Sequence, residues 1–289
     1  MKKIDIIAFT LLAAVGCQKV DSPSSDVLTF EIGLPSEVPT RTAFGTQSGS
    51  AMPLVWSAGD KVVVNGSESA ALTGTPGASA TFSVKGVNST PYNILYCGRN
   101  GSDATVTFPA IQTFVAGNVA PFTLPMYATT TSLTGIILNH LGCAFKIALT
   151  SSSSVTLSRI EFVANGGEMI SGDFTLGKNS GTGKFDASVF GPSGNNSKVV
   201  TMSPATSISS TAKTFYLVLP AGSYSEGFTG HFILSDESMM EVTFNTLGAS
   251  TLERAKIYDF GTVAFVNQGK IATEICGTED FTVQTISYE

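Results

Sequence analysis

Apolar and polar residues alternate with a period of two along most of this chain, and this alternation restricts its fold more than any other feature. It is clear in Leu28–Leu34, Ala80–Val84 and Phe215–Leu219. A strand buried on one face has this pattern because successive side chains point to opposite faces of its sheet. No stretch keeps apolar residues at the helical spacing i, i+3, i+4, i+7 over three turns. The pattern therefore predicts an all-β protein.

Turn signals separate the alternating segments. Asn65-Gly66, Asn100-Gly101 and Asn165-Gly166 are pairs that favour the left-handed backbone of tight hairpin turns. Short strands joined by such turns are typical of antiparallel β-sandwiches. Further strands are expected in Lys61–Asn65, Tyr92–Cys97, Val155–Ala164, Lys198–Met202 and Glu241–Asn245.

The length of 289 residues favours two domains, since one domain takes about 150 residues. The segment Pro121–Thr134 contains two prolines and a Thr/Ser run at Thr129–Ser132 that is expected to be a solvated loop. A boundary here gives an N-terminal β-sandwich at 27–132 and a C-terminal β-sandwich at 133–266. The tail 267–289 has its own alternation at Phe281 and Val283, so it is a candidate added strand, with a disordered end as the alternative.

The N-terminus has the features of an export signal. Lys2 and Lys3 precede the apolar stretch Ile6–Val15, which is shorter than the roughly 20 residues of a membrane-spanning helix. Small residues then lead to Cys17, as in a bacterial lipobox. This predicts a lipoprotein signal peptide at 1–16, acylation of Cys17, and a polar tether at 17–26. The alternative is an ordinary secretory signal with an incidental cysteine.

The composition argues against several classes of partner. Charged residues make up 13% of the chain and its formal net charge is −6. Nucleic-acid-binding proteins present basic surfaces to phosphates, so no nucleic-acid partner is expected. The 2 histidines and 4 cysteines are far apart in the sequence, which argues against a histidine- or thiolate-rich metal site. Neither a metal nor another cofactor is therefore expected.

Catalytic motifs are also missing from the sequence. It contains neither a G-x-S-x-G nucleophile turn nor H-E-x-x-H, and the glycine-rich segment Gly177–Lys184 departs from P-loop spacing. His140 and His231 have no partner at a fixed spacing, so each is expected to be structural or on the surface. The adjacent carboxylates Asp236-Glu237 and Glu279-Asp280 would point to opposite faces of a strand. The sequence thus predicts no catalytic residues and no enzyme.

Two single residues are expected in the hydrophobic core. Trp56, the only tryptophan, is followed by a tight Gly59-Asp60 turn, and its alternative role is a platform for stacking a glycan. Cys143 lies in Leu141–Leu149, where every odd position is apolar, so it is expected to be a buried thiol.

Several segments together resemble the fimbrillin family, which comprises the subunits and related lipoproteins of the type V pili of Bacteroidales. The segments that carry the resemblance are Pro39–Phe44, Val55–Val64, Asn139–Ile147, Phe215–Tyr224 and Lys256–Gly261. Their order and spacing match the family over about residues 27–265. The resemblance implies two transthyretin-like antiparallel β-sandwich domains in tandem, on a protein of the outer membrane and cell surface.

The resemblance also implies a way of assembly. In the family, a surface protease cuts the lipoprotein precursor after an arginine, which removes the lipid and the first strand. A neighbouring subunit then fills the opened groove with a strand of its own. Here Leu28–Leu34 is the first strand, Arg41 is the candidate cleavage site, and the tail 267–289 is a candidate donor strand.

We therefore expect a fimbrial subunit or a fimbria-associated adhesin whose partners are other fimbrial subunits and the outer membrane. One alternative is a monomeric, lipid-anchored surface protein that binds a host glycan or protein. A β-sandwich hydrolase, with carboxylates brought together from separate loops, is the third alternative.

Overall fold

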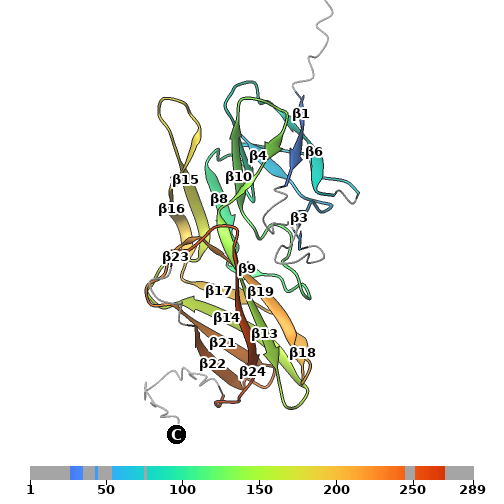
Figure 1. Cartoon of the computed structure of the whole chain (residues 1–289), viewed down its shortest axis with the longest axis vertical. Coiled ribbons are helices and arrows are strands. Elements are labelled where there is room, and N and C mark those ends of the chain that lie inside the picture. Colours follow the sequence, from blue (N-terminus) through green and yellow to red (C-terminus); the bar gives the residue numbers. More distant parts are fainter. Residues whose placement is uncertain (1–26, 35–42, 45–53, 75–76, 245–250, 271–289) are drawn as a thin grey trace, which may run out of the picture.

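Strands make up all the regular structure in the described part of the chain. The computed structural model describes residues 27–34, 43–44, 54–74, 77–244 and 251–270, and in these it has 24 strands and no helix. The all-β prediction is confirmed. Two lobes follow each other along the long axis (Figure 1). The upper lobe contains the sheets of β1 (Val27–Gly33) and β4 (Val62–Val64), and the lower lobe contains those of β13 (Gly142–Thr150) and β14 (Val155–Ala164).

The upper lobe is built from a three-stranded sheet, β11-β1-β6, and a five-stranded sheet, β12-β10-β7-β4-β5. A two-stranded ladder, β2-β3, accompanies them. The strands not yet bounded are β2 Ala43–Phe44, β3 Leu54–Val55, β5 Ser67–Glu68, β6 Ser79–Lys85, β7 Tyr92–Tyr96, β10 Met126–Thr130, β11 Ile136–Ile137 and β12 Asn139–His140.

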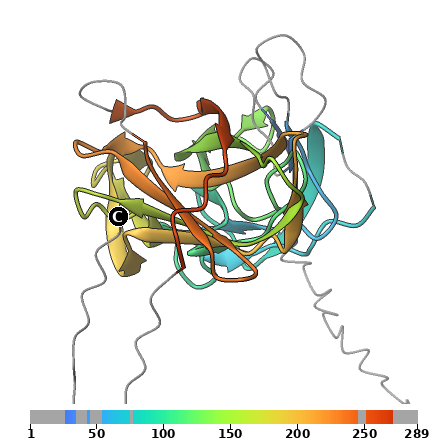
Figure 2. The same cartoon turned by 90° about the horizontal axis from the view of Figure 1, so that it is seen from below.

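The lower lobe is built from a three-stranded sheet, β19-β13-β24, and a larger sheet, β22-β21-β14-β17-β9, in which β18 also pairs with β14. Seen along the long axis, the strands lie in layers around the interior (Figure 2). The strands are β9 Ile111–Gln112, β17 Val199–Met202, β18 Thr206–Ile208, β19 Lys213–Pro220, β20 Gly222–Ser223, β21 Phe228–Leu234, β22 Met239–Phe244, β23 Thr251–Leu252 and β24 Ile257–Ala264. The short strands β20 and β23 pair with each other.

A third sheet, β16-β15-β8, joins the two lobes. Its strands are β8 (Thr105–Phe108), β15 (Ser171–Lys178) and β16 (Phe185–Ser197). The hairpin of β15 and β16 rises beside the upper lobe (Figure 1), and β15 pairs with β8 from Gly172–Phe108 to Thr175–Thr105. The glycine-rich segment Gly177–Lys184 covers the end of β15 and the turn of this hairpin.

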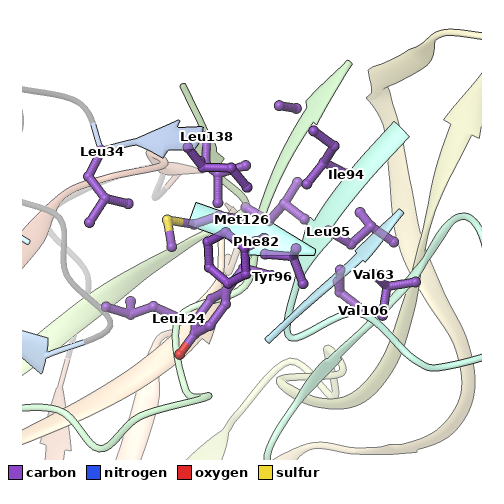
Figure 3. Close-up of a cluster of buried hydrophobic side chains, with 14 of the residues drawn as sticks. Leu34, Val63, Phe82, Ile94, Leu95, Tyr96, Val106, Leu124, Met126 and Leu138 are labelled. Atoms are coloured by element: carbon purple, nitrogen blue, oxygen red, sulfur yellow. The ribbon is translucent and has the colours of Figure 1, made fainter. Parts of the chain in front are cut away.

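The upper core fills the space between the sheets of the upper lobe (Figure 3). Phe82, Ile94, Leu95, Tyr96 and Met126 are buried at its centre. Residues from beyond position 132 complete it; they are Ile136, Leu138, Leu141, Ala144, Phe174, Leu176, Tyr216 and Val218. The upper core is therefore built by chain segments from both sides of the predicted boundary, which itself stays a prediction.

The lower core is rich in aromatic rings. Phe145 of β13 lies at its centre, with ring centroids 5.3 Å from Phe162, 5.0 Å from Phe228, 5.8 Å from Tyr258 and 4.9 Å from Phe260. Edge-to-face contacts of this kind stabilise beyond the burial of area alone. Cys143 is buried in the same core, as expected.

Gln112 of β9 fixes the free edge of β19 within the lower lobe. It is buried, and its side-chain amide bonds both backbone groups of Val218: Nε2 donates to the carbonyl at 2.7 Å, and Oε1 accepts from N–H at 2.9 Å. The amide thus takes the place of a neighbouring strand beside β19. Breaking this contact would leave buried polar groups without partners, which costs about 1–3 kcal/mol for each group.

Two expectations need correction. The sheets are mixed rather than purely antiparallel, since β24 runs parallel to β13 and β1 runs parallel to β11. The run Thr129–Ser132 is not wholly a loop, because Thr129 and Thr130 belong to β10, where they pair with β7. Threonine is β-branched and fits a strand, although its hydroxyl suggested a solvated segment. The transthyretin-like tandem arrangement stays a prediction.

Candidate functional site: the first strand and the tail base

The first strand, β1, is inserted between two others. It pairs antiparallel with β6 along its whole length, from Val27–Lys85 to Gly33–Ser79. On its other side it pairs parallel with β11, through Ile32–Ile136 and Gly33–Ile137. β1 is therefore an inner strand of its sheet, and without it the facing backbone groups of β6 and β11 would be unpaired.

The alternation in the sequence decides which face of β1 is buried. Phe30, Ile32 and Leu34 point into the upper core, with exposed fractions of 4%, 0% and 8%. Phe30 stacks on Phe82 of the adjacent strand, at a centroid distance of 6.5 Å. Burying each of these three side chains stabilises by about 1.5–3 kcal/mol, so together they contribute roughly 5–9 kcal/mol.

Trp56 holds the same strand from inside the core. Its indole Nε1 donates a hydrogen bond to the carbonyl oxygen of Ile32 at 3.2 Å. Its ring lies edge-on to Phe82 and to Tyr96, at 4.9 Å and 5.5 Å. With 1% of its surface exposed, Trp56 is a core residue as expected, and the glycan platform is excluded at this position.

The outer face of β1 is held much more weakly. Glu31 is exposed, and the side chains of this face make a hydroxyl pair between Thr29 and Ser83 at 3.2 Å. Most of what binds β1 is thus its backbone ladder and one apolar face. Any extended segment with suitable apolar residues could supply both.

The other end of the described chain lies along an exposed strand edge. The backbone of Gly269 accepts from Met239 N–H at 2.8 Å, and Gln268 N–H donates to Met239 O at 2.9 Å. Lys270 forms an antiparallel bridge with Ser238. Residues 267–270, the tail base, therefore continue the sheet next to β22.

Gln268 strengthens this contact with its side chain. Its Oε1 accepts from Glu241 N–H at 2.7 Å, and its Nε2 donates to Glu241 O at 3.4 Å. The side-chain amide of Gln268 thus makes the two hydrogen bonds to the backbone of Glu241 that a further residue of a paired strand would otherwise make. The tail base thereby covers part of an edge that could otherwise pair with another chain.

β1 and the tail base run in the same sense along the molecule. β1 is parallel to β11, from which the chain continues into the lower lobe, so β1 runs toward that lobe. The tail base runs toward the Ser235–Ser238 turn, and this turn is at the far end of the lower lobe, where Ser235 N–H bonds Thr156 O. Figure 1 shows β1 near one end of the long axis and β22 and β24 near the other.

The two residues predicted to be modified lie outside the described residues. Cys17 belongs to 1–26 and Arg41 to 35–42, and the alternating positions Phe281 and Val283 belong to 271–289. Leu34, the last described residue before Arg41, bonds Ala78 O through its N–H at 2.9 Å. Lipidation, cleavage and strand donation stay predictions.

The candidate catalytic groups are distributed over separate surfaces. His231 lies in β21 beside Glu241 of β22, at 3.3 Å, and its other ring nitrogen is 4.0 Å from Glu161 of β14. Asp236 caps a turn by accepting from Ser238, and this bond lowers the pKa of the Asp236 carboxyl. Within the described ranges, no three His, Cys, Asp or Glu side chains are placed to hold a metal ion. The same residues include no helix of the length and apolarity that crossing a bilayer requires.

His140 is buried at the junction of the lobes. It lines a cavity of about 10 Å³ together with Leu124, Cys143 and Lys256. Its Nε2 is buried and has no hydrogen-bond partner among the described residues. Burial lowers the pKa of His140 to about 3, because a protonated ring would lose its hydration there.

Replacing His140 with glutamine should make stability less dependent on pH. The unfolded chain takes up this proton near pH 6.5 and the folded chain only near pH 3. The free energy of unfolding of the wild type should therefore fall by about 1.4 kcal/mol per pH unit between these values. Between pH 6.5 and 4.5, H140Q should lose about 2 kcal/mol less than the wild type in urea unfolding. Val189→Ala, at an exposed residue that carries no titratable group, is the control that should keep the wild-type slope.

Comparisons with known proteins find similarity at the level of structure. No family model and no curated protein sequence matches the chain. A candidate cell adhesion protein of Bacteroides ovatus is 14% identical, with a TM-score of 0.44, over 84% of this chain and 94% of its own. One from Bacteroides uniformis is 11% identical, with a TM-score of 0.41, over 83% and 94%. The tip fimbrial protein Mfa3 of Porphyromonas gingivalis, with a C-terminal truncation, is 10% identical, with a TM-score of 0.35, over 80% and 94%. The three solved structures are thus described as cell adhesion or fimbrial proteins, and each is 10–14% identical to this chain.

Proposed function

We propose that this chain is a lipid-anchored surface protein of the outer membrane that assembles into fimbriae by strand exchange. Acylation of Cys17 anchors the exported chain, and cleavage after Arg41 releases the anchor together with β1. The emptied place of β1 then receives an extended segment of another subunit. In this proposal the chain consists of two transthyretin-like sandwiches, has no catalytic residues, and binds neither metal nor cofactor.

The place of β1 is the observation that carries the proposal. β1 is an inner strand that, together with Leu34 directly after it, buries three apolar side chains, and Trp56 bonds the backbone of β1 rather than a side chain. A different strand can reproduce all of these contacts. The stability of a whole domain is about 5–15 kcal/mol, and these buried side chains contribute roughly 5–9 kcal/mol. The cut chain therefore loses much of its folding free energy, which binding of a replacement strand would restore.

The direction of the tail base supports assembly from head to tail. It runs toward the far end of the lower lobe, in the same sense in which β1 enters the upper lobe. If subunits stack end to end, residues 271–289 of one subunit would enter the next in the direction of the β1 that they replace. Such a contact uses different surfaces on the two partners, so it generates an open filament instead of a closed ring.

Treatment of the whole chain with an arginine-specific protease tests this function. We expect one cut after Arg41, a stable remainder starting at Thr42, and a ladder of oligomers in size-exclusion chromatography. Arg41→Gln should stay uncut and monomeric. A synthetic peptide with the sequence of Val27–Leu34 should suppress the ladder by filling the groove.

A chain that is cut after Arg41 and stays a folded monomer would overturn strand exchange. It would favour the alternative of a monomeric, lipid-anchored protein that binds a host glycan or protein. Mass spectrometry of the membrane fraction tests the anchor separately, because Cys17→Ser should abolish acylation whether or not subunits assemble.

A further inference from the structure

A cavity of about 350 Å³ opens on the upper lobe, away from the candidate strand-exchange site. Its lining consists of Gly59, Lys61, Val63, Glu68, Cys97, Gly98 and Phe122. Cavities that bind small molecules span about 300–1,000 Å³, so this one has the size for a single small ring.

Two residues of this lining have strained backbones. Phe122 has φ of 58° and Cys97 has φ of 57°. The left-handed region disfavours residues with a side chain, above all bulky ones, and costs about 1–3 kcal/mol for each residue. Strain of this kind persists where the surroundings enforce it, and it is concentrated at binding and active sites.

A buried polar network enforces the conformation of Phe122. Its N–H donates to the hydroxyl of Tyr96 at 2.8 Å, and that hydroxyl donates to Oδ1 of Asp60 at 2.8 Å. The other carboxylate oxygen of Asp60 accepts from Ser57 N–H at 2.6 Å. The Trp56–Asp60 segment thus uses a buried carboxylate to fix an aromatic residue at the rim of the cavity.

The ring of Phe122 is partly open to solvent. It stacks on Tyr96 at a centroid distance of 5.6 Å and an interplanar angle of 19°, and 39% of Phe122 is exposed. Because Tyr96 covers one face, the opposite face is the one that is available. An exposed aromatic face at the rim of a cavity favours a ligand with a flat apolar side.

The polar groups of the cavity carry no net charge. Lys61 Nζ and Glu68 Oε1 form an ion pair at 2.5 Å, with exposed fractions of 43% and 33% for the two side chains. Burial raises the pKa of the Cys97 thiol, which is therefore uncharged. Lys61 retains two N–H donors and Glu68 a second oxygen, so the pair can both donate to and accept from one ligand.

We propose that this cavity binds one neutral sugar ring, such as the terminal residue of a glycan. A pyranose has an apolar C–H face to lie on Phe122, and adjacent hydroxyls that can donate to Glu68 and accept from Lys61. A charged ligand would compete with the ion pair, whereas a neutral polyol leaves it intact. No residue of β1 lines this sugar site.

Ligand-detected saturation-transfer NMR on the whole chain tests the sugar site. The probes are the methyl glycosides of glucose, galactose, mannose and N-acetylglucosamine, in a zwitterionic detergent that contains no sugar. We expect at least one glycoside to bind the wild type. Phe122→Gly and Glu68→Gln should each weaken that binding about tenfold or more.

Phe122→Gly separates binding from folding. Glycine adopts φ of 58° without strain, which offsets part of the lost stacking on Tyr96, so this variant should still unfold in one cooperative thermal transition. Phe122→Tyr should retain binding, as should Val189→Ala, which alters an exposed apolar residue elsewhere. The proposal is overturned if none of the four glycosides binds, or if F122G binds them as well as the wild type does.

Discussion

Residues 27–132 expressed alone should show no cooperative unfolding transition, whereas the chain from Val27 to Lys270 should show one. The fragment would contain the predicted N-terminal sandwich but not the residues that complete its core. Phe174 and Leu176 fill the upper core from the β15–β16 hairpin, and Tyr216 and Val218 fill it from β19. At about 1.5–3 kcal/mol for each buried apolar side chain, the missing contacts exceed what a small domain can lose.

Polar contacts of the same hairpin lead to the same expectation. Asp173 accepts from Arg99 at 3.0 Å and from Thr107 at 2.7 Å. Asn93 of β7 donates to Gly183 O at 2.9 Å, at the turn of the hairpin. In the fragment, Asn93 would lose this bond and β8 would lose its ladder with β15.

Adding residues 133–270 in trans provides the control. This second fragment carries the hairpin and the segments around β11 and β12, so mixing the two should restore near-ultraviolet circular dichroism and a cooperative melt. A cooperative melt of 27–132 alone would contradict this prediction. It would show that the upper lobe folds without the β15–β16 hairpin and that the hairpin is not required for its stability.

The positions and bounds of single strands could be predicted from the sequence. The predicted strand Val155–Ala164 has the bounds of β14, and Leu28–Leu34 differs from β1 by one residue at each end. Alternation reports the burial of one face, which is a property of each strand by itself. Cys143 was placed in the core for the same reason.

Which strands pair, and in which direction, could not be predicted from the sequence, because strand pairing depends on residues far away in the chain. Nothing in Ile257–Ala264 indicates that β24 runs parallel to β13. In β13, the even position Ala144 also packs into the upper core, since the β19-β13-β24 sheet is covered on both faces. A period-two pattern identifies the more apolar face and says little about the other.

For the candidate site too, local features could be predicted from the sequence and long-range contacts could not. The alternation of β1 predicted a strand with one apolar face. The bond from Trp56 to Ile32 O, the parallel neighbour β11 and the path of the tail base all join segments that are distant in sequence. Cys17 and Arg41 rest on sequence motifs alone and stay predictions.

Replacing Ile32 with aspartate should make the whole chain assemble without any protease. Ile32 is completely buried, and a carboxylate placed there would lose its hydration without gaining a cation, at a cost of several kcal/mol. Leaving the groove avoids this cost, because β1 has few side-chain bonds on its outer face to hold it. The vacated groove of one I32D chain should then accept a strand from another.

Size-exclusion chromatography of I32D with an intact N-terminus measures this assembly. Thr29→Asp is the matched control, since it puts the same charge on the exposed face of the same strand and loses only the hydroxyl contact with Ser83. T29D should stay monomeric. The peptide with the sequence of Val27–Leu34 should return I32D to a folded monomer, because it supplies the missing apolar face and the carbonyl for Trp56.

The peptide also separates strand exchange from a general loss of stability. If I32D aggregated merely because it unfolds, a short peptide that contacts only β6, β11 and Trp56 would not restore a cooperative melt. A folded, monomeric I32D without peptide would contradict the proposal, since the groove would then tolerate being empty or charged. Assembly that needs no protease and is reversed by the peptide would identify the removal of β1 as the step that controls polymerisation, with cleavage after Arg41 as one way to achieve it.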